Sequence, residues 1–98
     1  MVLNKKQIEF LEKHQVCRFA TVSKDAIPRV TPVIYALDGE NVVIAVDYGT
    51  KKLANCRENE NVSLVVDEIH SKMAVIIQGR CKIHEKRKEY FRLTDSIR

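Results

Sequence analysis

The sequence lacks cysteines at the spacing of a zinc site. Cys17, Cys56 and Cys81 are far apart, form no CxxC pair and have no histidine at metal-ligand spacing. Their odd number also argues against a disulfide framework. We therefore expect buried, reduced thiols, with Cys17 and Cys81 inside strands, and no metal site.

Catalytic constellations and long apolar runs are also missing. The histidines His14, His70 and His84 are scattered, and none lies near a nucleophile in the sequence, so we assign no catalytic residue. No stretch approaches the roughly 20 apolar residues that span a bilayer, and the first six residues hold no apolar signal core. We therefore expect a cytoplasmic protein with no membrane partner.

Nucleic-acid binding is not expected, although the net charge is +4. Acidic residues are interleaved with the basic ones over residues 82–89, so no basic tail or stripe forms. The aromatic residues near predicted strands, Phe19, Tyr35 and Tyr48, do not cluster as a base-stacking surface would require.

The size of the chain, by contrast, points to association. Its 98 residues allow one domain, spanning residues 1–98, with a hydrophobic content of 45% that is ordinary for a globular protein. A domain this small buries only about two thirds of its unfolded surface. Dimerisation or ligand binding would therefore add useful stability.

The segment 46–55 has the features of an anion site. An apolar strand is followed by a turn at Gly49 and by a short helix that opens at Thr50, with Lys51 and Lys52 in its first turn. Unpaired amides and the helix dipole make such an end positive, and phosphate is its usual occupant. The glycine spacing of a Walker or dinucleotide loop is absent, so two solvated surface lysines are an equal alternative from this segment alone.

The remaining pattern predicts a mainly β protein with short helices. Asn4 and Gln7 form a capping box for a helix over residues 5–13, and the charged tail over residues 85–93 also reads as helical. Asp38-Gly39 signals a hairpin. Five antiparallel strands joined mostly by hairpins would make a small barrel; they are expected over residues 17–23, 29–37, 41–46, 62–67 and 73–83.

Two residues interrupt these strands. Pro32 cannot donate to a ladder, so the second strand should be at an edge or bulged there. A bulge would leave groups free to hold a flat ligand, whereas an edge proline only protects against aggregation. Gly79 predicts a bend or bulge of the kind that closes a barrel.

The order of several segments resembles the pyridoxamine 5'-phosphate oxidase-like, FMN-binding split-barrel proteins. The resemblance covers residues 16–83 and rests on similar order and spacing of five segments, residues 18–22, 28–33, 47–55, 59–67 and 75–81. It implies a homodimer of split barrels with a flavin in each of two clefts at the interface.

The resemblance also implies site residues. Arg29, Val30 and Thr31 would lie along the isoalloxazine ring, with Pro32 shaping that edge. Ala45 and Val46 would lie beside the ring and ribityl chain, and Thr50, Lys51 and Lys52 would hold the phosphate. Gln78 would reach the flavin across the dimer, or else be a solvent-facing residue of an alternating strand.

Family members usually continue with a further helix and strand that carry the arginine and histidine gripping the substrate phosphate of pyridoxamine phosphate oxidases. We therefore do not expect that activity here. The resemblance implies an FMN-dependent oxidoreductase that passes hydride or electrons between a small-molecule donor and acceptor. The alternative is a non-catalytic module that binds or senses FMN, and relatives of this fold also bind the deazaflavin F420 or haem.

Overall fold

The computed structural model describes residues 3–39, 41–45, 50–84 and 90–93. Within these ranges the chain forms two short helices and six strands. The helices are α1 (Lys5–Glu12) and α2 (Lys51–Glu58). The strands are β1 (Val16–Val22), β2 (Pro28–Asp38), β3 (Asn41–Ala45), β4 (Asn61–Glu68), β5 (Met73–His84) and β6 (Tyr90–Leu93).

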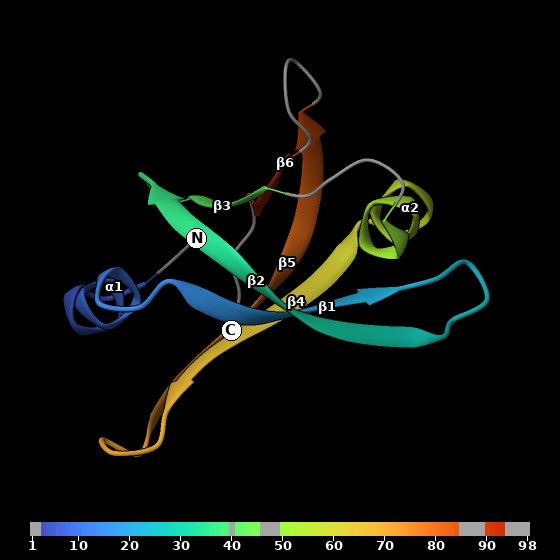
Figure 1. Ribbon diagram of the computed structural model, residues 1–98. Coiled ribbons are helices and arrows are strands. Elements are labelled where there is room, and N and C mark those ends of the chain that lie inside the picture. The colour runs from blue at the N-terminus through green and yellow to red at the C-terminus, as the bar shows by residue number, and fades with distance from the viewer. Residues whose placement is uncertain (1–2, 40, 46–49, 85–89, 94–98) are drawn as a thin grey trace.

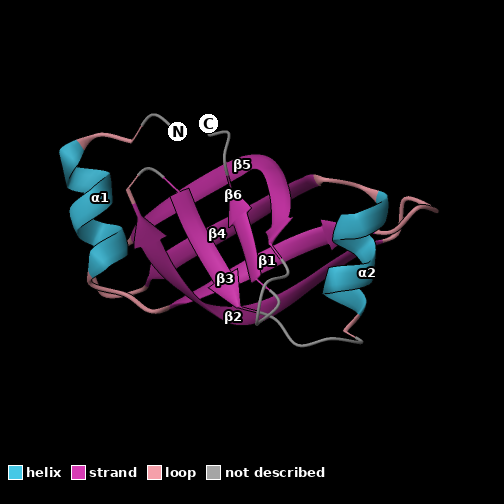
Figure 2. Ribbon diagram, turned by 90° about the horizontal axis from the view of Figure 1, so that it is seen from above, coloured by secondary structure: helices cyan, strands magenta, loops and turns pink. Residues whose placement is uncertain are grey.

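The strands close into an antiparallel barrel in the order β1-β2-β3-β6-β5-β4 (Figures 1 and 2). Two of the strands, β2 and β5, change pairing partner along their length and so connect the two halves of the barrel, β1 with β4 and β3 with β6. β2 pairs with β1 over residues 28–34 and with β3 over residues 35–38. β5 pairs with β4 over residues 73–80 and with β6 over residues 81–84. The predicted mainly β, antiparallel barrel with short helices is confirmed.

The end of the described chain corrects one prediction. Residues 90–93 form a strand, not the end of a helix, and β6 pairs with both β3 and β5; residues 85–89 lie outside the described residues. Leu93 is opposite Val42 on one side and Cys81 on the other. The local composition of residues 85–93 favours a helix. In the folded barrel, however, residues 90–93 pair with backbone groups of β3 and β5 that would otherwise have no hydrogen-bond partner.

The two interrupting residues are accommodated without a break in register. Pro32 is opposite Arg18, and Gln15 accepts a hydrogen bond from the Tyr35 amide at 2.9 Å. Since hydrogen-bonded and non-hydrogen-bonded pairs alternate, Arg18 and Pro32 form a non-bonded pair. The proline nitrogen therefore faces away from β1, towards an edge that no other described strand occupies. The edge interpretation holds, and the pairing with β1 has no bulge.

Gly79 is opposite Val62, also in unbroken register with β4. β5 changes partner from β4 to β6 between Arg80 and Cys81. The predicted bend thus lies beside the point where β5 passes between the two halves of the barrel, where Figure 2 shows it curving. The Asp38-Gly39 hairpin is also confirmed, because Asp38 is opposite Asn41 and Gly39 has a φ of +62°.

The inner faces of the strands form one core. In β1 the alternate residues Cys17, Phe19 and Thr21 are all buried. The hydrophobic members contributed by the other elements are Phe10, Leu11, Tyr35, Val42, Ile44, Leu53, Cys56, Val62, Leu64, Val66, Val75, Ile77 and Cys81.

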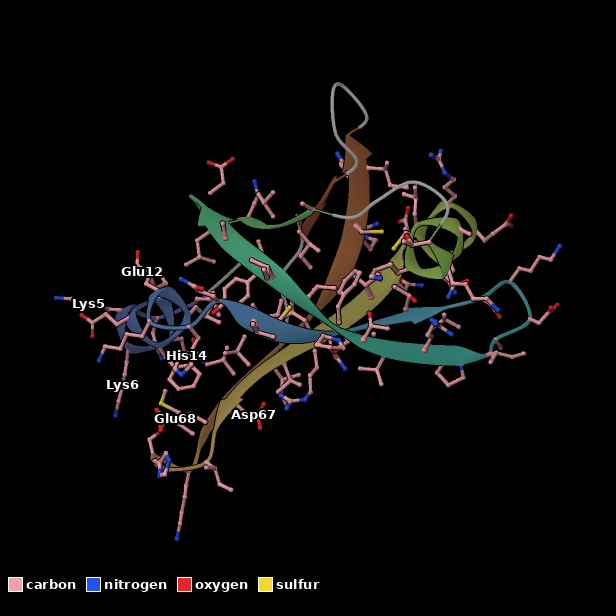
Figure 3. The ribbon with its side chains drawn as sticks, in the orientation of Figure 1. Lys5, Lys6, Glu12, His14, Asp67 and Glu68 are labelled. Carbon is pink, nitrogen blue, oxygen red and sulfur yellow. The ribbon has the colours of Figure 1, made fainter. Side chains whose placement is uncertain are left out.

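Helix α1 covers one side of the barrel, opposite α2 (Figures 1 and 2). Its capping box is present, with Asn4 Oδ1 accepting from the Gln7 amide at 2.8 Å and Gln7 Oε1 from the Asn4 amide at 2.9 Å. After the helix, His14 points towards the β4–β5 hairpin, where its Nε2 lies 3.9 Å from Glu68 Oε1 (Figure 3). No described helix is long and apolar enough to cross a membrane.

Candidate functional site

The N-terminus of α2 has the predicted anion-binding features. The Thr50 hydroxyl accepts a 3.4 Å hydrogen bond from the Leu53 amide, and the first turn contains no acidic residue. Lys52 is half-buried, whereas Lys51 is exposed. A half-buried lysine side chain is less free to move than an exposed one, so Lys52 is the better placed of the two for a phosphate. The preceding turn, residues 46–49, lies outside the described residues.

Helix α2 is tied to the barrel by packing and by one polar contact. It packs against β1 and β5 and buries Leu53 and Cys56. The Asn55 Nδ2 group donates a 3.1 Å hydrogen bond to the hydroxyl of Thr21, whose side chain is buried. Thr21 in turn is opposite Arg29. Helix α2 and the first part of β2 therefore lie at the same side of the barrel.

The predicted residues of β2 divide between two faces of the sheet. Arg29 and Thr31 are opposite Thr21 and Phe19, so they share the inner face with these buried residues. Val30 and Pro32 are on the outer face, where both are exposed. The Thr31 hydroxyl is buried without a hydrogen-bond partner in the described structure. An unsatisfied buried hydroxyl is costly, and a polar ligand group would satisfy it.

The outer face of the barrel exposes several large apolar side chains around an ion pair between Arg18 Nη1 and Asp67 Oδ1, which lie 2.7 Å apart. Val16 and Ile34 are directly opposite each other on β1 and β2, with 51% and 70% of their surface exposed. Val65 of β4 is opposite Ile76 of β5, which is 55% exposed. Val30 joins this surface at 63% exposure. We call Val16, Val30, Ile34 and Ile76 the outer apolar face.

Gln78 lies on the same face. Gln78 is directly opposite Ser63 on β4, and Ser63 is opposite Ala20 on β1. Ala20 is in turn opposite Val30 on β2, so the four residues form one row across the sheet. Gln78 is exposed. It is therefore separated from the N-terminus of α2 within one chain. Ala45 is exposed at the end of β3, and Val46 lies outside the described residues.

Sequence reasoning missed the Thr21–Asn55 contact and the outer apolar face. Nothing in the sequence pairs Thr21 with Asn55, because 34 residues separate them. The outer face did leave a signal. Val75-Ile76-Ile77 is continuously apolar, and this pattern indicates a strand covered on both faces.

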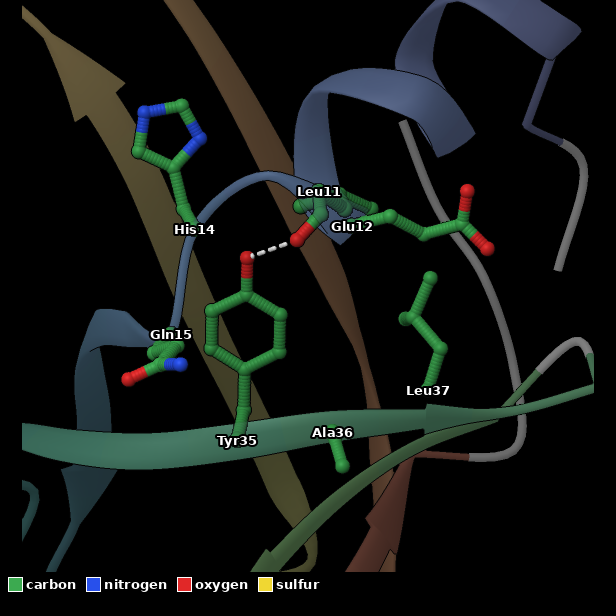
Figure 4. A pocket seen from close by; sticks show the side chains of 7 residues that line it. All are labelled: Leu11, Glu12, His14, Gln15, Tyr35, Ala36 and Leu37. Atoms are coloured by element: carbon green, nitrogen blue, oxygen red, sulfur yellow. Dashed lines mark hydrogen bonds between the residues drawn. The ribbon is translucent and has the colours of Figure 1, made fainter.

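A cavity of about 280 Å³ lies between α1 and β2, away from α2. Beside it, the Tyr35 side chain extends from β2 towards α1, and its hydroxyl donates a 2.5 Å hydrogen bond to the Leu11 carbonyl (Figure 4). Burial raises the pKa of Tyr35 to about 12, and the nearby Cys17 thiol adds to this shift. The cavity is lined by Leu11, Glu12, His14, Gln15, Tyr35, Ala36 and Leu37, none of which was predicted as a site residue.

The cysteines are free and buried, as expected. Burial raises the pKa of Cys17 to about 12, against the smaller effect of a backbone hydrogen bond. The described residues contain no group of three or more His, Cys, Asp or Glu side chains that could hold a metal ion.

Comparison with solved structures defines the fold as a split barrel. HutZ, the haem storage protein from Vibrio cholerae, matches with a TM-score of 0.82 at 14% identity, over 100% of this chain and 93% of HutZ. A candidate pyridoxamine 5'-phosphate oxidase from Lactobacillus delbrueckii matches with a TM-score of 0.82 at 20% identity, over 96% and 91% of the two chains. An F420 reductase matches with a TM-score of 0.74 at 23% identity, over 83% of this chain and 64% of the reductase.

The sequence itself identifies the family. The family model for pyridoxamine 5'-phosphate oxidase matches residues 3–97, so the chain belongs to this family. A comparison with curated proteins found no match. The resemblance inferred from the five segments is thereby confirmed.

Proposed function

We propose that this protein is an FMN-binding flavoprotein and that it transfers hydride or electrons through the flavin. The observation that carries this proposal is the juxtaposition of two features at one side of the barrel. The cationic N-terminus of α2 suits a phosphate, and β2, which pairs with the strand β1 that α2 packs against, holds the buried, unpartnered hydroxyl of Thr31. The Asn55–Thr21 hydrogen bond holds α2 to β1, and Thr21 of β1 is opposite Arg29 of β2.

The proposed roles follow the family resemblance. Thr50, Lys51 and Lys52 hold the phosphate, with Lys52 as the main cation. The Thr31 hydroxyl donates to or accepts from a polar group of the flavin, and the adjacent Arg29, Val30 and Pro32 flank the ring. Ala45 and Val46 lie beside the ring and ribityl chain. These assignments fit the positive helix end and the unsatisfied hydroxyl.

When bound, the flavin supplies the redox chemistry, accepting hydride from a reduced nicotinamide or another donor. The protein residues bind the phosphate, orient the ring and shield it from water.

The outer apolar face supports a homodimer, the assembly common in this family. Val30 and Gln78 lie in one row on this face, with the apolar pairs Val16–Ile34 and Val65–Ile76 beside it. A second copy would cover the exposed apolar surface. In the proposed dimer it would also bring its Gln78 towards the flavin of the first copy, although Gln78 is separated from α2 within one chain.

Absorption spectroscopy tests the cofactor. The protein is incubated with FMN, desalted and scanned; retained peaks near about 370 and 450 nm support the proposal. A Soret band in the purified protein would indicate that the cofactor is haem and not FMN. Retention of F420 but not of FMN would indicate that the cofactor is the deazaflavin. Anaerobic reduction of the bound flavin by NADH or NADPH would then establish turnover, whereas an inert flavin would identify a binding or sensing module.

A further inference from the structure

An ion pair lies between the members of the outer apolar face. Arg18 is on β1 and Asp67 is on β4, the two central strands of the sheet that runs in the order β2-β1-β4-β5. The Nη1 group of Arg18 donates a 2.7 Å hydrogen bond to Oδ1 of Asp67. Both side chains are open to solvent, at 60% and 49% exposure. In a single chain such a pair adds little to the stability of the fold, because water screens it.

Apolar side chains border this pair on the same face. Towards β5, Arg18 is opposite Val65, which is opposite the exposed Ile76. Two residues before Arg18, and therefore on the same face of β1, the exposed Val16 is opposite the exposed Ile34 on β2. A group of large exposed apolar side chains marks a surface that a partner covers. The ion pair therefore lies within that surface and not beside it.

The charges on this face decide which partner fits it. Of the described residues that the register places there, the remaining charged one is Arg80, at the end near α2 and 3.7 Å from Glu60. The charges of Arg18 and Asp67 cancel each other. Within the described part of the chain each contacts only the other, so the guanidinium keeps spare N–H donors and the carboxylate keeps Oδ2 as a spare acceptor.

We propose that a second copy of this chain covers the pair, and that Arg18 of each copy contacts the partner's Asp67. The inference rests on the homodimer proposed above. In a two-fold symmetric interface, a contact from one residue to another is repeated in the reverse direction. Positive and negative charges therefore alternate around the symmetry axis, and the spare donors of each guanidinium meet the spare acceptor of the other copy's carboxylate.

Other kinds of partner fit this face less well. A cationic or anionic surface would repel one of the two charges, and a wholly apolar surface would leave the spare donors and acceptor without hydrogen bonds. A second copy leaves neither a charge nor a polar group unpaired. The apolar side chains supply attraction that is not directional, whereas the charge pairs of Arg18 and Asp67 select the same chain as partner and fix its orientation.

Charge reversal of the full-length protein tests this contact. Arg18→Asp places two negative charges side by side on the face, and Asp67→Arg places two positive ones there. Each variant alone should have a dimer dissociation constant raised roughly 30-fold or more, because like charges would face each other across the axis. An equimolar mixture of the two variants should form a heterodimer, because a negative face then meets a positive one. Analytical ultracentrifugation measures all four samples, including the unmodified chain.

The mixture also controls for folding, since a variant that restores association must be folded. Lys82→Glu is the matched charge reversal outside this face, on the part of β5 that pairs with β6, and should dimerise like the unmodified chain. Dimers of Arg18→Asp and Asp67→Arg on their own would overturn the proposal. So would two variants that are folded by circular dichroism, monomeric alone and still monomeric when mixed.

These results separate this inference from the proposed function. If the unmodified chain is a dimer and the variants dimerise equally well, the charge contact is wrong, and the flavoprotein and its dimer stand. If the unmodified chain is a monomer, both the dimer and the charge contact are wrong. Retention of FMN, measured by absorption of the same samples, reports on the cofactor in either case.

Discussion

The side-chain amide of Asn55 donates a 3.1 Å hydrogen bond to the hydroxyl of Thr21, joining α2 to the end of β1. Thr21 is the buried polar side chain of the described core, with 1% of its surface exposed. Because Thr21 is opposite Arg29, this single contact relates the position of the helix to the strand that carries the predicted ring-binding residues.

Removing either partner should destabilise the protein. Asn55→Ala leaves the buried Thr21 hydroxyl without its donor and should cost about 1–3 kcal/mol, and Thr21→Val should cost about 1 kcal/mol. Since the two groups bond to each other, the double variant should lose less than the sum of the single losses. Urea unfolding of the four proteins measures this coupling; strictly additive losses would contradict a direct contact.

Lys52→Ala should weaken FMN binding by about 1.5–3 kcal/mol, or roughly 10- to 150-fold, because a charged hydrogen bond to phosphate is lost. Lys51→Ala should have a smaller effect, since this side chain is exposed. Fluorescence titration of FMN measures both. Lys82→Ala, an exposed lysine on β5, is the control, and an unchanged affinity in Lys52→Ala would remove the phosphate-binding role.

The outer apolar face should be the dimer interface. Sedimentation at micromolar concentration should show a dimer for the unmodified protein and a monomer for Ile34→Lys or Ile76→Lys, because an unpaired ammonium would be buried between the copies. The control is Ile69→Lys. Ile69 is 82% exposed in the β4–β5 turn, outside this face, and its substitution should leave the dimer intact. A well-folded monomer of the unmodified chain would rule out the interface.

Stability should fall with rising pH from about pH 9. Burial raises the pKa of Cys17 from 9.0 to about 12, so between these values the unfolded chain loses a proton that the folded chain keeps. Its contribution to stability is therefore complete below pH 9 and is lost progressively towards pH 12. Cys17→Ala should be less stable at pH 7, because it leaves a cavity, but its stability should decline less steeply between pH 9 and 10.

Urea unfolding at several pH values provides the measurement for Cys17. Tyr35, whose pKa is also raised to about 12, contributes in the same direction in both proteins, but less in Cys17→Ala because the thiol adds to its shift. Equal slopes for the two proteins would show that the Cys17 thiol titrates alike in the folded and unfolded chains.

Much of the fold was predictable because local signals and burial agree. The alternation of Cys17, Phe19 and Thr21, the Asp38-Gly39 turn and the Asn4–Gln7 capping box each act over a few residues, and each is present. β6 was not predictable in this way. Its strand pairing depends on β3 and β5, and no short-range pattern in residues 85–93 reports on those distant partners.

The candidate site shows the same division. Thr50 and the lysines after it were readable as a helix start, and Thr50 does cap α2. Strand geometry predicts that Arg29 and Thr31 lie on one face of β2 and Val30 and Pro32 on the other. Which face is turned to the core cannot be predicted from these residues alone, because it depends on the elements that cover each face. The orphaned Thr31 hydroxyl depends on packing in three dimensions and had no sequence signature.

The position of β6 in the barrel also bears on synthesis. β6 pairs with β3 on one side and β5 on the other, although it follows both in the chain. During translation, both neighbours emerge from the ribosome before residues 90–93 do, and until then each presents a row of unpaired amides and carbonyls. A nascent chain that folded before β6 emerged would be a barrel open between β3 and β5, and the four residues of β6 cover both of these strand edges.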